Sequence, residues 1–327
     1  MEDNKKYDII IPTAKKDLNF LPWAIKYAKK NLIGAERIFV ITKKDNFNIA
    51  KKYLEKFEKK QANLRAKGKD NFSFEYHKYK EGEGNGEVLV DFIDENELVK
   101  GMNFSRIREL LSSKGIDPRW TGWYFQQFLK FGFAQSAYCR NYYLSWDSDT
   151  IALAPIYFIQ EGKPMFTLKS EYHPSYFSTI KKMLGLEKQI EKSFIAESML
   201  FKKDIMQEII GIIQNLNKGK SWYENIIDSF NTEEKPGYFS EFETYGTYCM
   251  VKHRDLYGFQ QLNTFRRAGM IRGRYIDDRL LNNLSVDIEI ASFEAGEGPW
   301  WVKIRNMNFK RFLDSIAYRT KLKKIKN

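Results

Sequence analysis

Two acidic residues, Asp147 and Asp149, stand directly after the apolar run Tyr142–Trp146. Residues two apart on a strand point to the same side, so these carboxylates converge where the strand meets a loop. A hard divalent cation prefers such oxygen ligands and leaves positions open for substrate phosphates. The spacing therefore predicts a metal-diphosphate site, with Ser148 as a further contact, although short acidic pairs also cap helices and solvate loops.

A helical segment, Trp123–Lys130, precedes this strand and carries donors for a phosphate. At helical spacing Gln126 and Lys130 share a face, and Gln127 is a near neighbour of Lys130. We expect these amide and ammonium groups to assist in holding the diphosphate.

The N-terminal part of the chain predicts a βαβ unit. A strand at Tyr7–Pro12, a helix from about Phe20 to Asn31 and a strand at Arg37–Thr42 follow one another, an order that favours a parallel, right-handed arrangement. Open α/β sheets bind ligands beyond the carboxyl ends of their strands. Pro12 and Thr13 are therefore candidate nucleotide contacts.

The rest of the pattern predicts one continuous α/β domain with a helical C-terminal part. We divide the chain into a catalytic domain, 1–255, and a C-terminal extension, 256–327, that completes the acceptor side. Further strands are expected at Phe72–Tyr79, Pro164–Leu168 and Ser193–Phe201. Further helices are expected at 46–67, 102–114, 123–136, 176–184, 203–215 and 221–230, and a polar loop at 81–86.

Composition places the chain among globular proteins. Apolar residues make up 43% of its 327 residues and charged residues 29%, so it can bury a substantial core. Its two cysteines, Cys139 and Cys249, give neither a metal-ligand spacing nor a disulfide framework. With no signal-peptide pattern and no apolar run of about 18 residues, a cytoplasmic location is expected.

The net charge of +12 calls for an anionic partner. Positive charge gathers near the C-terminus, where basic residues between Trp300 and Asn327 face one acid, Asp314, and alternate with aromatic rings. Such a segment suits an anionic membrane surface, and so predicts peripheral binding to the inner face of the plasma membrane. A solvated terminal helix with one packed face would have the same composition.

Four segments together resemble bacterial nucleotide-sugar-dependent glycosyltransferases of the GT-A fold, in particular a branch associated with surface-polysaccharide genes. They are Tyr7–Pro12, Gly122–Lys130, Trp146–Thr150 and Ser240–Gly246. The resemblance covers roughly residues 7–253. It implies an α/β fold of Rossmann-like type, with a mostly parallel sheet flanked by helices and helical C-terminal additions.

The resemblance also implies a donor site. Asp147 and Asp149 would hold Mn²⁺ or Mg²⁺ against the diphosphate of a nucleotide sugar, most simply a UDP-sugar, and the metal would neutralise the leaving group. Many members of the fold add a third ligand, often a histidine late in the domain. Among the three histidines only His253 has a suitable position, and a surface role would explain it as well.

Transfer with inversion additionally needs a carboxylate base beside the acceptor hydroxyl. Glu241 and Glu243, at the start of an expected helix, are the candidates, although a glutamate there also favours the helix dipole. Tyr172 and His173 are candidates for an acceptor pocket, or for packing alone. The acceptor would be a glycan or lipid-linked glycan in lipopolysaccharide or capsule synthesis.

Two other functions are compatible with parts of the sequence. An aspartyl-phosphate phosphohydrolase also places Asp-x-Asp after an apolar strand, but usually on the first strand and with Thr or Val where this chain has Ile151. A nucleic-acid-binding protein would account for the charge and the aromatic rings. We rank it last because no binding motif is present and the charge is concentrated in the last segment.

Overall fold

A five-stranded sheet forms the centre of the computed structural model, which describes residues 6–66 and 89–298. Its strand order is β10-β5-β1-β3-β4. The strands are β1 (Tyr7–Pro12), β3 (Ala35–Thr42), β4 (Leu89–Asp94), β5 (Tyr142–Trp146) and β10 (Ser198–Lys202).

The sheet is mainly parallel. Strand β1 runs parallel to both β3 and β5, and β3 parallel to β4, whereas β10 is antiparallel to β5. The carboxyl ends of four strands therefore share one edge, where ligands of open α/β sheets bind. The predicted α/β class, with a mostly parallel sheet flanked by helices, is confirmed.

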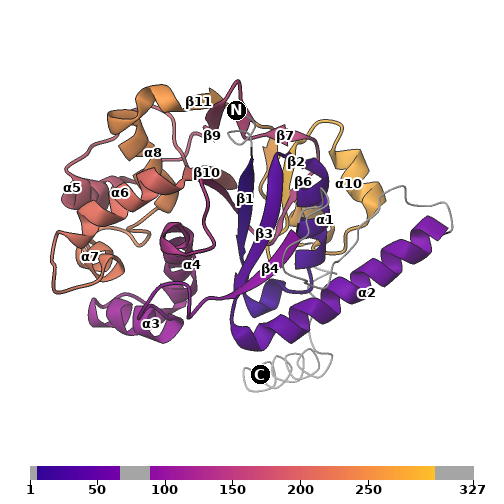
Figure 1. Ribbon diagram of the computed structural model, residues 1–327, viewed down its shortest axis with the longest axis horizontal. Helices are drawn as coiled ribbons and strands as arrows, with labels where there is room; N and C mark the ends of the chain where they lie inside the picture. The colour runs from indigo at the N-terminus through magenta and orange to yellow at the C-terminus, as the bar shows by residue number, and fades with distance from the viewer. Residues whose placement is uncertain (1–5, 67–88, 299–327) are drawn as a thin grey trace, which may run out of the picture.

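Helices cover both faces of this sheet (Figure 1). One group consists of α1 (Leu21–Asn31) and α2 (Phe47–Ala66). The other group consists of α3 (Phe104–Ser113), α4 (Thr121–Gly132), α5 (Pro174–Leu184), α6 (Lys203–Gln214), α7 (Trp222–Asp228) and α8 (Glu241–Lys252).

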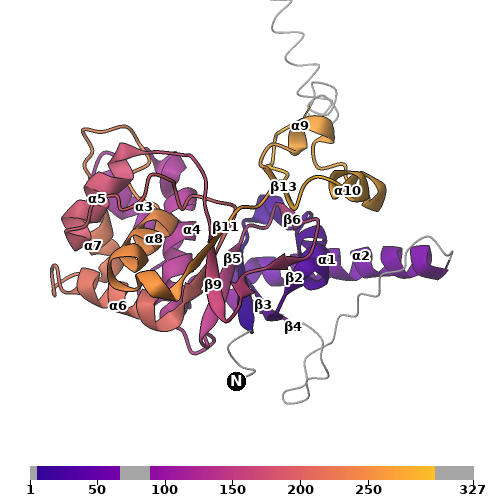
Figure 2. The ribbon, with the colours of Figure 1, turned by 90° about the horizontal axis from the view of Figure 1, so that it is seen from above.

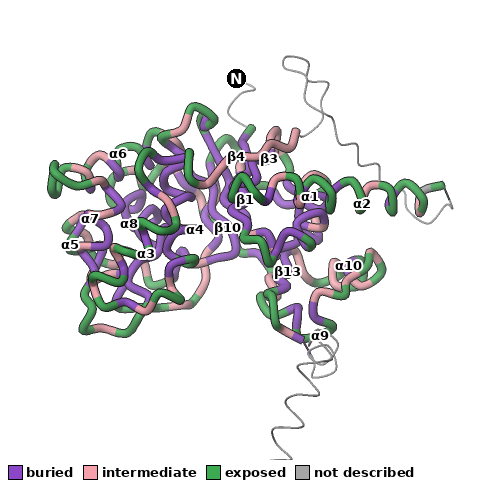
Figure 3. The backbone as a smooth tube through the Cα atoms, turned by 90° about the horizontal axis from the view of Figure 1, so that it is seen from below, coloured by how far each residue is buried: buried purple, intermediate pink, exposed green. Residues whose placement is uncertain are grey.

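Strand β1 explains why the core has two layers. Ile9 and Ile11 pack with α1 residues in one apolar cluster, whereas Ile10 packs with α4 residues in another. A strand that is buried on both faces reads as a continuous apolar run rather than an alternating one, as β1 does. Figure 3 shows β1 and β10 within the buried centre, while α2 projects with mostly exposed or half-buried residues.

Short strands extend the domain beyond the central sheet. They are β2 (Leu32–Ile33), β6 (Thr150–Ala152), β7 (Ile156–Tyr157), β8 (Ile159–Gln160), β9 (Lys163–Thr167), β11 (Gly258–Gln260), β12 (Thr264–Phe265) and β13 (Ile290–Ser292). Strand β11 pairs with β9, and β13 with β6. Figure 2 shows β6 and β13 beside α9 (Gly269–Arg272) and α10 (Asp278–Leu284).

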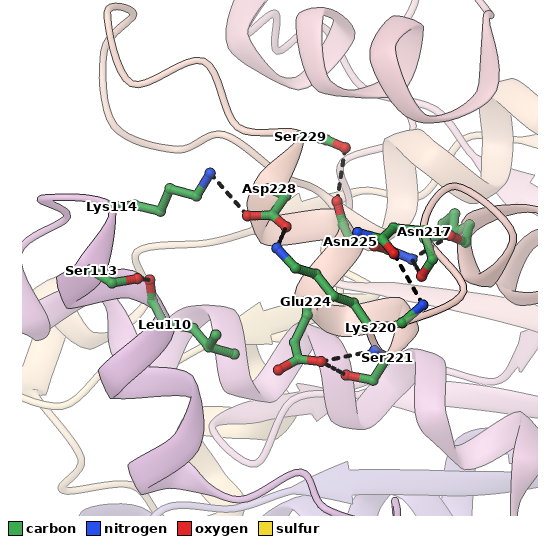
Figure 4. A network of polar contacts seen from close by, with 12 residues as sticks. Leu110, Ser113, Lys114, Asn217, Lys220, Ser221, Glu224, Asn225, Asp228 and Ser229 are labelled. Atoms are coloured by element: carbon green, nitrogen blue, oxygen red, sulfur yellow. Dashed lines mark hydrogen bonds and ion pairs between the residues drawn. The ribbon is translucent and has the colours of Figure 1, made fainter.

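Ion pairs fasten α7 to α3, the helix that precedes α4 (Figure 4). Asp228 accepts from Lys114 at 3.0 Å and from Lys220, and Glu224 pairs with Arg106. Glu224 also closes a capping box with Ser221 at the start of α7. This network joins α7 to α3, which in turn packs against α4.

Most expected elements are confirmed, with differences of a few residues at their ends. The strand expected at Ser193–Phe201 is corrected, because only Ser198–Lys202 pairs with β5, and Ser193 forms an isolated bridge with Lys169. The strand expected at 72–79 and the loop at 81–86 lie outside the described residues. Within the described part of the chain, no helix has the length and apolar character that crossing a membrane requires.

Candidate active site

Helix α4 brings a polar face onto the end of β5. The amide Nε2 of Gln126 donates to Oδ1 of Asp147 at 3.0 Å, and Nζ of Lys130 lies 3.2 Å from the same oxygen. Tyr143, on β5, donates its hydroxyl to the carbonyl of Lys130 and so anchors the helix to the strand. The structure thus brings together Gln126, Lys130 and Asp147, which the sequence analysis assigned to one site.

Lys130 lies between two carboxylates. Its ammonium is 2.9 Å from Oε1 of Glu241 as well as 3.2 Å from Asp147, and both Lys130 and Glu241 are at least 95% buried. Burial lowers the pKa of Lys130, but the charges of Asp147 and Glu241 outweigh it and hold that pKa above its usual range. Lys130 therefore fixes the position of Glu241 relative to Asp147.

The N-terminus of α8 positions Glu241. The backbone N–H of Glu241 donates to Oε1 of Gln127 at 3.2 Å, and Ser240 accepts from the N–H of Glu243, so two donors of the first turn are satisfied. Glu243 itself accepts hydrogen bonds from the hydroxyl of Ser193 and the N–H of Phe194. Burial raises the pKa of Glu243.

Asp149 lies in a more enclosed setting on the turn after β5. Nη2 of Arg274 is 3.6 Å from its Oδ2 and 2.7 Å from Oδ1 of Asp17. Burial, and next the charge of Asp147, raise the pKa of Asp149 to about 7. The carbonyl of Asp149 accepts from the N–H of Phe293 at 2.8 Å. Arg274, a residue late in the chain, therefore supplies the positive charge beside Asp149.

Pro12, Thr13 and Ser148 are buried at the same edge of the sheet. Thr13 donates its N–H to the carbonyl of Ile41 and its hydroxyl to that of Ile11. Because these side chains are enclosed, the exposed residues that follow β1, Lys15 and Lys16, are more accessible to a ligand at this edge.

His253 lies at the far end of α8 from Glu241. The helix has 12 residues, so its ends are roughly 18 Å apart at 1.5 Å per residue. His253 instead pairs with Glu208, at 2.9 Å. The structure does not bring His253 to Asp147 and Asp149. Over residues 6–66 and 89–298, no group of three or more His, Cys, Asp or Glu side chains is arranged to hold a metal ion.

The candidate acceptor residues directly precede α5. His173 occupies the N-cap position without a side-chain cap hydrogen bond, lies 3.5 Å from Glu171, and has its ring 4.9 Å from that of Tyr176. Tyr172 is exposed and stacks on Phe177. Helix α5 packs against α8, which brings this segment to the side of the site that carries Glu241.

Glu197 is a residue that the sequence analysis missed. Its neighbour Ser198 pairs with Trp146 at the end of the antiparallel β10–β5 ladder, so Glu197 directly precedes β10 at the edge where Asp147 follows β5. Glu197 is 5% exposed, and neither carboxylate oxygen has a hydrogen bond in the described structure. Lys169 at 3.7 Å and Arg266 at 3.6 Å are its ion-pair partners. Only the register of β10 could have revealed this residue.

The model of one protein family matches residues 24–268, which is most of the chain. Its description is "Family of unknown function (DUF6492)". This chain belongs to that family. The site residues of this DUF6492 chain from Gln126 to His253 fall within the matched residues, whereas Pro12, Thr13 and Arg274 lie outside them. No curated protein matches the sequence.

Several solved glycosyltransferase structures are similar to this DUF6492 chain at low identity. Mouse xyloside xylosyltransferase 1, apo form, is 12% identical with a TM-score of 0.44, over 88% of this chain and 97% of that one. The galactosyltransferase LgtC, in complex with donor and acceptor sugar analogues, is 13% identical with a TM-score of 0.41, over 94% of each chain. The bifunctional glycosyltransferase WbbM is 12% identical with a TM-score of 0.44, over 90% and 47%. Similarity of this degree leaves the activity of the chain to be argued from its own site.

Proposed function

We propose that the chain is a divalent-metal-dependent glycosyltransferase, which moves a sugar from a nucleoside diphosphate sugar, with UDP the first candidate nucleotide, to a glycan or lipid-linked glycan. The observation that carries this proposal is the buried Lys130, which joins Asp147, at the carboxyl edge of a mainly parallel sheet, to Glu241. A metal-binding acid and a candidate base are thereby held at a fixed separation. Asp147 and Asp149 follow β5, whereas an aspartyl-phosphate phosphohydrolase usually carries this pair on its first strand, and no nucleic-acid-binding motif accompanies the positive charge.

The residues at the end of β5 fit Mn²⁺ or Mg²⁺. The side-chain contacts of Asp147 within the described structure all fall on Oδ1, which leaves Oδ2 for another ligand. Repulsion from Asp147 contributes to the raised pKa of Asp149, as expected for two acids that lie close to one another. Two carboxylates with open positions for phosphate oxygens suit these ions. When bound, the ion would offset the charge that develops on the leaving diphosphate.

The chain's own residues would then act on the acceptor. In a transfer with inversion, Glu241 accepts the proton of the acceptor hydroxyl while that oxygen attacks the anomeric carbon. The bond from this carbon to the diphosphate oxygen breaks, and its electron pair leaves with the nucleoside diphosphate. Lys130 and Gln126 keep Asp147 in place during this step. A transfer with retention does not need this base, and the anomeric configuration of the product distinguishes the two.

We place the activity in bacterial surface-polysaccharide synthesis, such as that of lipopolysaccharide or capsule, at the inner face of the plasma membrane. The support for the membrane location is the net charge of +12 and the basic segment near the C-terminus, which lies outside the described residues. Co-sedimentation with vesicles rich in anionic lipid, weakened by salt, is the expected result. Equal binding to neutral vesicles would contradict this location.

A thermal-shift panel tests the donor site. UDP, GDP, CDP, TDP and CMP are each added with and without Mn²⁺. One nucleoside diphosphate is expected to raise the melting temperature only with the metal, since a ligand that binds only the folded state stabilises it. The Asp149→Ala variant should lose this shift, while Asp204→Ala, a change at an exposed acid on α6, should keep it. A folded protein that responds to none of the five would refute the proposal.

A further inference from the structure

A tryptophan on the first turns of α4 is exposed beside the candidate site. Trp123 is 36% exposed, whereas most aromatic rings of α4 and α8 are buried. It precedes Gln126 by three residues, so the two side chains are neighbours on the helix surface. Gln126 in turn contacts Asp147 at 3.0 Å. An exposed indole is therefore only one side chain away from the proposed metal ligand.

The indole of Trp123 is held in place by other rings. Tyr176 lies nearly parallel to it, with ring centres 6.5 Å apart and an interplanar angle of 23°. Tyr124 and Trp120 meet it edge-on at 4.8 and 5.4 Å. Because its neighbours already fix its orientation, binding a ligand against Trp123 costs little side-chain entropy.

Polar groups lie near Tyr176, the ring that supports Trp123. Burial raises the pKa of Tyr176, and the negative charge of Glu241 raises it further, so the ring that supports Trp123 lies within electrostatic range of Glu241. The ring of His173 is 4.9 Å from that of Tyr176. An aromatic surface with amide, imidazole and carboxylate groups at its border matches a pyranose, which has one apolar face and hydroxyls around its edge.

The position of Trp123 argues against the nucleobase as its occupant. The nucleotide end of the proposed site lies at the carboxyl ends of β1 and β3, next to β4 in the sheet order. Tyr176 belongs to α5, which packs against α6, α7 and α8. Figure 1 shows α5 and the strands β3 and β4 on opposite sides of α4.

We propose that Trp123, supported by Tyr176, is the stacking platform for a pyranose ring of the acceptor, and that the acceptor is therefore a glycan bound through a sugar near its reacting hydroxyl. This inference rests on the proposed function, because it assigns the acceptor side of the same site. Trp123 thereby joins the acceptor-binding residues, and the acceptor belongs to the class of glycans.

Nuclear magnetic resonance of the indole N–H groups tests the platform without turnover. The resonance of Trp123 is identified by its absence in Trp123→Phe, with Trp23→Phe as the matched control on α1. Methyl glycosides of glucose, galactose, mannose and N-acetylglucosamine are added, with and without Mn²⁺ and the nucleoside diphosphates. At least one glycoside is expected to move the Trp123 resonance saturably, while the buried Trp146 and Trp222 do not respond. Isothermal titration calorimetry, which does not depend on the indole resonance, should show that Trp123→Ala binds this glycoside about tenfold more weakly or worse, a loss of about 1.4 kcal/mol.

The outcomes separate the two proposals. Metal-dependent nucleotide binding with no glycoside response at Trp123 would overturn the platform and leave the donor site intact. A glycoside response without any nucleotide binding would support the platform and refute the proposed function. Movement of the Trp123 resonance by the nucleoside diphosphate alone would place the base on this ring and overturn the inference. Unchanged resonances of Trp146 and Trp222 in Trp123→Ala show that this variant is folded.

Discussion

Replacing Lys130 with methionine is expected to lower the free energy of unfolding by about 3–5 kcal/mol, the loss typical of removing one partner of a buried ion pair. Lys130 is 4% exposed and neutralises Glu241, which is 5% exposed. Methionine preserves much of the volume but leaves this carboxylate buried without its cation. Urea unfolding followed by circular dichroism measures the change.

A double variant separates charge from packing. Lys130→Met with Glu241→Gln removes both charges, and it should recover most of the stability because no uncompensated ion remains buried. Lys181→Met, which breaks an exposed pair with Glu187, should change stability little. A Lys130→Met variant as stable as the native protein would mean that the ion pair does not hold the site together.

Replacing Asp149 with asparagine is expected to stabilise the metal-free protein at pH 8 and to abolish metal-dependent nucleotide binding. The pKa of Asp149 is raised from 3.8 to about 7, first by burial and then by Asp147. The folded protein thus keeps a proton that the unfolded chain releases between these values, so this group opposes folding increasingly as the pH rises through that window. The gain at pH 8 is up to about 4 kcal/mol, from roughly three pKa units.

Thermal unfolding at pH 5 and pH 8, with and without Mn²⁺ and the active nucleotide, measures both effects. At pH 5 the native carboxyl group is protonated but the unfolded one, with a pKa of 3.8, is already ionised, so the stability difference should fall to about 1.6 kcal/mol, and it should approach zero only below the unfolded pKa. In the native protein, stabilisation by metal and nucleotide should grow from pH 6 to pH 8 as Asp149 ionises. An asparagine variant that is less stable at pH 8, or that retains the metal-dependent shift, would contradict the assignment.

Local patterns were sufficient to predict the central part of the fold. The apolar runs of β1 and β3, separated by α1, predicted a parallel pair, and the pair is present with the expected bounds to within two residues. Gln126 and Lys130 could be placed on one face because helical spacing is regular. Their contact with Asp147 followed from a strand that begins shortly after the helix ends.

Residues that act through long-range pairing could not be predicted in this way. Arg274 reaches Asp149 from a segment whose short strands give weak periodic signals, and Glu197 is brought to the edge where Asp147 follows β5 only by the antiparallel register of β10. His253 shows that a suitable position along the sequence does not ensure a position near the site. Its late position in the sequence suggested a ligand, but the length of α8 carries it to the end opposite Glu241.

The pairing of β6 with β13 has a consequence for the order of events during synthesis. Thr150 and Ser292 share a hydrogen bond although 142 residues separate them, and Phe293 donates to the carbonyl of Asp149. At about 5–20 residues per second, a ribosome needs roughly 7–30 s to make the intervening chain. The strands β1, β3 and β5 can associate during that interval, but the turn with the second acid cannot close. A nascent chain should therefore acquire its central sheet well before it can bind a substrate.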